Sequence, residues 1–89
     1  MNKCFSIGDR VVISENYHWA KDASGEIVPP PDYVVEISDG WKNNVRELRS
    51  LNGKQLFYWI KFDTPQVDVD GDGPYHEAEI NSDYLKLNE

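Results

Sequence analysis

The dipeptide Asn52-Gly53 restricts the fold of this chain more than any other local feature. Asn-Gly is the preferred pair in two-residue hairpin turns, because both central residues of that turn take positive φ angles. The segment after it alternates like a strand and has apolar residues on both faces: Leu56, Tyr58, Ile60 and Phe62 on one face, and Phe57 and Trp59 on the other. We therefore predict a hairpin with 45–51 as its first arm and a central, doubly covered strand as its second.

A helix competes with the first arm of this hairpin. Trp41, Val45, Leu48 and Leu51 follow one another at spacings of four, three and three, which is a helical stripe. Gly53 would then lie just beyond the end of the helix. We favour the hairpin, and one short helix at 41–51 stays open as the alternative.

Glycine and proline separate the rest of the 89-residue chain into short segments rich in β-branched and aromatic residues. This pattern is typical of small all-β domains. We predict further strands at 10–14, 25–28, 33–37 and 76–80, a long loop at 16–24, a polar segment at 63–74 and a closing turn at 81–83. The sequence thus predicts a mainly all-β chain with one domain over 1–89, folded as a five- to six-stranded small barrel.

Composition excludes several classes of protein. The chain carries 9 basic and 16 acidic residues, for a net charge of −7, so we expect no nucleic-acid partner and no anionic membrane surface. No apolar run reaches the roughly 20 residues that a membrane span needs. Cys4 is the single cysteine, and segment 1–9 has no apolar stretch typical of a secretory signal, so we expect a cytoplasmic protein.

Four short motifs carry a resemblance to a known family. In chain order they are Phe5-x-x-Gly8-Asp9-Arg10-Val11, Gly25-x-Ile27-Val28, Tyr58-x-Ile60-x-Phe62-Asp63 and Ala78-Glu79-Ile80-x-x-Asp83-Tyr84-Leu85. Their order is similar to that of SH3-like barrels in accessory subunits, above all the C-terminal barrel of the nitrile hydratase β subunit. It resembles the variable chain of ferredoxin–thioredoxin reductase more distantly. The resemblance implies an SH3-like barrel without catalytic residues that packs against a partner chain.

The polar segment contains a calcium-loop pattern. Asp68-x-Asp70-x-Asp72-Gly73, followed after five residues by Glu79, matches the spacing of an EF-hand loop. Calcium takes six to eight oxygen ligands, which alternate carboxylates in a tight loop supply. The flanking segments are predicted strands, whereas an EF-hand has helices there. We therefore expect no obligatory cofactor, and keep calcium binding by Asp68, Asp70, Asp72 and Glu79 as an alternative to a solvated acidic turn.

Aromatic residues in the loops form the second candidate site. Tyr and Trp suit peptide grooves because they combine apolar area with a polar tip. The residues predicted to bind a partner are Tyr17, His18, Trp19, Trp41 and Tyr75. No catalytic grouping is evident, so we expect a non-catalytic module that binds a protein through the aromatic loop and the acidic loop. An acidic inhibitor or immunity protein that blocks a basic enzyme is the remaining alternative.

Overall fold

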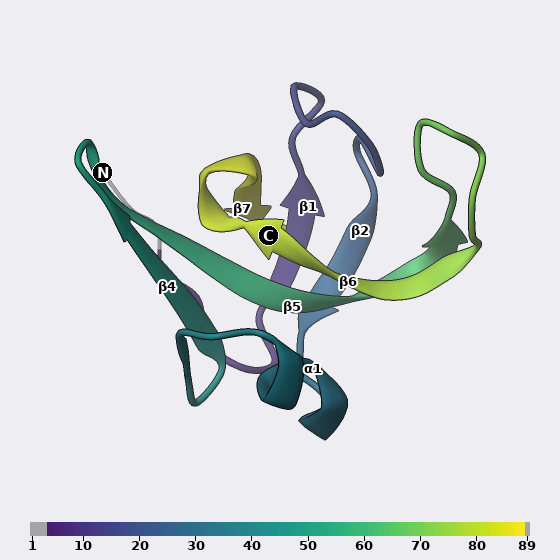
Figure 1. Cartoon of the computed structure of the whole chain (residues 1–89). Coiled ribbons are helices and arrows are strands. Elements are labelled where there is room, and N and C mark those ends of the chain that lie inside the picture. The colour runs from purple at the N-terminus through teal and green to yellow at the C-terminus, as the bar shows by residue number, and fades with distance from the viewer. Residues whose placement is uncertain (1–3, 89) are drawn as a thin grey trace.

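Seven antiparallel strands form one strongly curled sheet (Figure 1). The computed structural model describes residues 4–88. Met1–Lys3 and Glu89 lie outside the described residues. Met1–Lys3 belong to the segment 1–9, which we expected to lack a secretory signal. The strands are β1 (Arg10–Ile13), β2 (Ser24–Ile27), β3 (Trp41–Lys42), β4 (Val45–Ser50), β5 (Gly53–Gln66), β6 (Tyr75–Asn81) and β7 (Leu85–Leu87). Two short helical segments accompany them, α1 (Asp32–Ile37) and the 3-10 turn η1 (Ser82–Tyr84).

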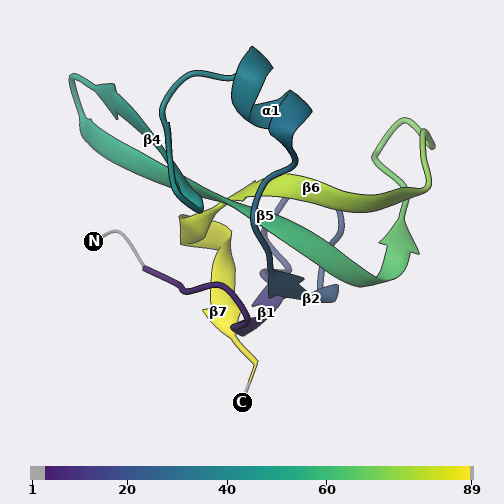
Figure 2. The same ribbon diagram turned by 90° about the horizontal axis from the view of Figure 1, so that it is seen from below.

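Strand β5 organises the sheet. Its first half pairs with β4 and its middle pairs with β2, while β6 pairs along its opposite edge. The main path of the sheet is β3-β4-β5-β2-β1-β7. Figures 1 and 2 show α1 on the side of β5 opposite to β1 and β7. The predicted all-β class and the central position of this strand are confirmed, and the sheet is a curled half-barrel.

The core lies inside the curl of the sheet. Ile27, Ile60 and Ile80 are fully buried, and they come from the three strands β2, β5 and β6. Because successive side chains of a strand point to opposite faces, the alternation 56-58-60-62 fills this core from one face of β5. The other face of β5 carries Trp59, which is also buried.

Two predictions were wrong, and one alternative is excluded. Segment 33–37 is the helix α1 rather than a strand: Pro31 precedes it, Asp32 lies in its first turn, and only Val34 of this segment is buried. Segment 41–51 is not a helix, because it forms β3 and β4. The sheet has seven strands instead of five or six, since the two-residue β3 and the three-residue β7 were not predicted as strands.

The central hairpin forms one residue away from the expected register. Ser50 pairs with Gly53, so the two loop residues are Leu51 and Asn52. Gly53 has a φ of 120°, whereas Asn52 is not among the residues with positive φ. The hairpin itself is confirmed, but the positive-φ requirement falls on Gly53 alone.

The acidic loop is shorter than predicted, whereas the β1–β2 loop begins and ends slightly earlier in the chain than predicted. Strand β5 continues to Gln66, which pairs with Tyr75, so the acidic loop comprises 67–74. The loop between β1 and β2 comprises 14–23. The closing turn is confirmed, because the side chain of Asn81 accepts a hydrogen bond from the backbone N–H of Asp83 at the start of η1. In residues 4–88 no helix has the length and apolar character needed to cross a membrane.

Candidate functional site: a groove with aromatic and acidic walls

Two loops far apart in the sequence meet at one end of the sheet. In Figure 1 the β1–β2 loop and the acidic loop 67–74 both lie at the upper side of the molecule. Trp19 links them: its ring makes an edge contact with Tyr75 at 5.7 Å between centroids, and another with Phe62 at 5.8 Å. Phe62 belongs to the core, so Trp19 is anchored on a rigid part of the fold.

A groove of about 580 Å³ lies beside this contact. Its aromatic wall comes from the β1–β2 loop, α1, β5 and β6, and consists of His18, Trp19, Tyr33, Trp59 and Tyr75. Trp59 is nearly covered, while Tyr33 is 61% exposed and forms an outer rim. The groove therefore joins a fixed aromatic floor to an accessible edge, which suits the binding of an extended side chain.

The acidic wall of the groove comes from the acidic loop and β6. It consists of Asp68, Asp70, Glu77 and Glu79. Arg46 neutralises Glu79, because its Nη1 lies 2.9 Å from the Glu79 Oε1 and its guanidinium rests over the Phe57 ring. Within residues 4–88 the other three carboxylates make no ion pair. The groove therefore carries uncompensated negative charge.

Glu77 is fixed by an indole and not by a cation. The Nε1 of Trp59 donates a 2.7 Å hydrogen bond to the Glu77 Oε1. Because indole is neutral, this bond orients the carboxylate and leaves its charge in place. Glu77 is half-buried, so its charge is less screened than that of an exposed residue.

The acidic loop is organised around Asp68. Its Oδ1 accepts hydrogen bonds from the backbone N–H groups of Asp70 and Asp72, both at 2.9 Å. The three aspartates each offer a carboxylate oxygen within 4.8 Å of the others. Burial, and then the charges of Asp68 and Asp72, raise the pKa of the Tyr75 phenol, whose oxygen is 3.5 Å from the Asp68 Oδ2.

The predicted calcium ligands are only partly brought together. Asp68, Asp70 and Asp72 converge, but Glu79 is outside their cluster and is paired with Arg46. Strands β5 and β6 flank the loop, so the helices of an EF-hand are not present on either side of it. Three carboxylates are fewer than the oxygen ligands that calcium takes, so water would supply the remainder.

The five predicted partner-binding residues lie in three different places. His18, Trp19 and Tyr75 line the groove. Tyr17 packs against the core and stacks on Tyr84 at 4.9 Å, and burial raises its pKa. Trp41 lies in β3, half-buried, and it does not line the groove.

Three polar or aromatic residues of the groove, Tyr33, Trp59 and Glu77, were not predicted as site residues, and neither were the apolar Val69 and Ala78. Tyr33 was assigned to a strand, although Pro31 and Asp32 before it are signals for the start of a helix. Trp59 was placed on the second face of the central strand and given no site role, although its polar Nε1 was a signal that it also reaches a polar group. Glu77 was not singled out, because its contact with Trp59 depends on the pairing of β5 with β6.

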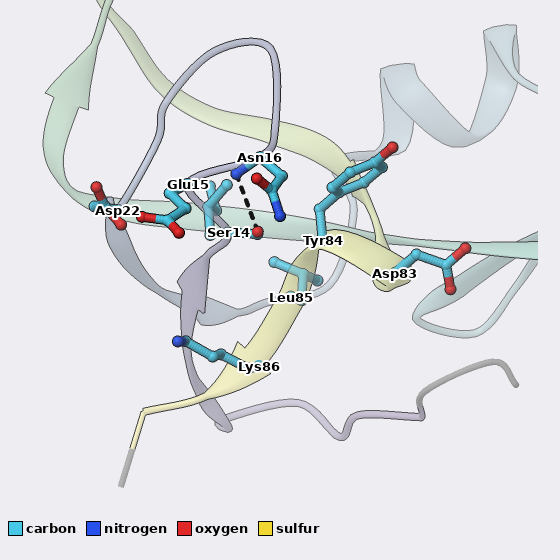
Figure 3. A pocket seen from close by; sticks show the side chains of 9 residues that line it. Ser14, Glu15, Asn16, Asp22, Asp83, Tyr84, Leu85 and Lys86 are labelled. Carbon is cyan, nitrogen blue, oxygen red and sulfur yellow. Dashed lines mark hydrogen bonds between the residues drawn. The ribbon is translucent and has the colours of Figure 1, made fainter.

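A second pocket lies at the other side of the β1–β2 loop (Figure 3). It has a volume of about 270 Å³ and is lined mainly by polar side chains of 14–16, 22 and 83–86. Figure 3 shows Glu15 and Asp22 on one side of this pocket and Asp83 on the other. Asn16 donates its backbone N–H to the Ser14 Oγ at 3.1 Å, which closes the loop locally. The pocket has no aromatic floor comparable to that of the groove.

No family model, curated protein or solved structure matches the chain. The resemblance to the nitrile hydratase β subunit therefore stays a prediction.

Proposed function

We propose that this chain is a non-catalytic protein-binding module whose groove holds a basic segment of a partner protein. The observation that carries the proposal is the combination of three carboxylates that make no ion pair in the described part of the chain, Asp68, Asp70 and Glu77, with the rings of Trp19 and Trp59 in one groove. We also propose a cytoplasmic setting, because a lone cysteine suits a reducing compartment.

Lysine and arginine are the side chains that fit both walls. Their aliphatic stems pack on aromatic rings, and their charged ends interact with ring faces and carboxylates. The net charge of −7 adds long-range attraction for a basic partner and raises the association rate. A partner with acidic side chains would meet repulsion from the same wall.

A blocked peptide of alternating arginine and valine, RVRVRVR, tests the proposal. Tryptophan fluorescence follows its titration into the wild type and into the double variant Asp70→Asn, Glu77→Gln. We expect the groove variant to bind about tenfold more weakly, equivalent to about 1.4 kcal/mol. The matched control is Glu15→Gln, Glu36→Gln, which removes the same charge from exposed residues outside the groove. Equal weakening in both variants, or no binding by the wild type, would overturn the proposal.

A second candidate function is calcium binding by the acidic loop, which the convergence of Asp68, Asp70 and Asp72 within 4.8 Å favours. The incomplete ligand set implies weak affinity, with a Kd of about 10⁻⁴–10⁻³ M, as in extracellular calcium modules. Titration calorimetry with CaCl₂ measures it, and Asp72→Asn should abolish the heat while Glu15→Gln leaves it unchanged. Absence of heat from the wild type at millimolar calcium would dismiss this function.

A further inference from the structure

Strand β6 has a sheet neighbour along only one edge. It pairs antiparallel with β5 through residues 75–81, and no other strand of the described chain pairs with it. Figure 2 shows β5 along one side of β6 and no strand along the other. Because strand pairing uses alternate backbone groups, half of the N–H and C=O groups of β6 point away from β5.

The groove lies along this open edge. Glu77 and Glu79 are on the same face of the sheet as Trp59, since Glu79 pairs with Trp59 and Glu77 accepts its indole N–H. Ala78 points to the opposite face of the sheet, and yet it lines the groove together with Glu77 and Glu79. A groove reached from both faces of one strand must follow the edge of that strand.

The side chains of β6 select what can pair with it. Its sequence contains two glutamates and no lysine or arginine, and Asp68 and Asp70 lie across the groove. Charged side chains on an edge strand discourage pairing with another copy of the same chain. A strand carrying lysine or arginine meets opposite charges instead.

Building on the proposed function, we propose that the basic partner segment binds as an extended strand added to the open edge of β6. Its backbone hydrogen bonds to the free groups of β6, while alternate basic side chains extend over Trp59 towards Glu77. Main-chain pairing supplies a large part of the affinity in this mode, and the side-chain pockets supply the specificity.

Backbone methylation of the RVRVRVR peptide tests this mode. One version carries N-methyl groups on the arginines and the other carries them on the valines. An added strand turns the N–H groups of one set towards β6, so we expect one version to lose binding by at least tenfold while the other retains it. The unmethylated peptide is the reference, and its failure to bind would instead refute the proposed function.

Equal behaviour of the two methylated versions would overturn strand addition. If both bind, the groove captures side chains alone; if both fail, the loss does not follow the alternation of a paired strand.

Amide hydrogen exchange gives an independent measurement. We expect the peptide to slow exchange at alternate amides of 75–80 that do not bond to β5, and unchanged exchange there would contradict the proposal. Sedimentation without peptide should show a monomer, and self-association through β6 would contradict the charge argument.

Discussion

The indole N–H of Trp59 donates a 2.7 Å hydrogen bond to Glu77 on the neighbouring strand, so a buried core-strand residue orients a carboxylate of the groove. The register of β5 and β6 creates this contact, because Trp59 pairs with Glu79 and Glu77 lies two residues before it on the same face. A structural contact and the proposed binding role of Glu77 therefore meet in one pair of residues, and a conservative substitution tests the two separately.

Glu77→Gln should weaken binding without unfolding the protein. The amide oxygen of glutamine still accepts the indole N–H, so we expect a change in unfolding free energy below about 1 kcal/mol. The lost charge should weaken binding of the RVRVRVR peptide by about three- to tenfold, equivalent to about 0.7–1.4 kcal/mol. Thermal unfolding and fluorescence titration measure the two effects. Unchanged affinity would show that Glu77 does not contact the basic peptide.

The core was predictable from the sequence because it depends on local alternation. Ile60 and its neighbours in β5 alternate strictly, and the structure buries them as expected. The groove was only partly predictable, since Trp19 and Tyr75 meet through pairings between distant strands. Tyr33 was missed because the β-branched and aromatic residues of 33–37 indicated a strand and outweighed the helix-start signals of Pro31 and Asp32.

Gly25→Ala should destabilise the fold, because a strand residue approaches it closely. A Cβ at position 25 would lie 2.7 Å from the Ile60 side chain and 2.7 Å from the carbonyl oxygen of Lys61. Overpacking of this kind costs about 1–3 kcal/mol. Urea unfolding monitored by circular dichroism measures the loss. Ser24→Ala in the same strand is the control, and an equal effect of both substitutions would exclude the close approach as the cause.

The ion pair between Arg10 and Asp63 should make stability depend on pH. The hydrogen bond from Arg10 lowers the pKa of the Asp63 carboxyl below its ordinary value. A lowered folded pKa stabilises the protein above the ordinary pKa of aspartate, near 4, and this contribution disappears as the pH falls through the folded pKa.

The variant Asp63→Asn isolates this contribution. We expect a lower Tm than the wild type at pH 7, and a difference that shrinks to nothing as the pH falls well below 4. Glu36→Gln, an exposed residue without an ion pair in residues 4–88, serves as control. A difference between Asp63→Asn and the wild type that persists at acidic pH would contradict the role of the ion pair.

The central hairpin should tolerate substitution at Asn52 but not at Gly53. Gly53 has a φ of 120° with open space where a Cβ would stand, so alanine there suffers backbone strain without a steric clash. We expect Gly53→Ala to cost about 1 kcal/mol or more. Asn52 has no positive φ, so Asn52→Ala should cost less than about 0.5 kcal/mol. Urea unfolding compares the two variants. An equal cost at both positions would indicate the turn expected from the Asn-Gly pattern, with Asn52 and Gly53 both at its centre.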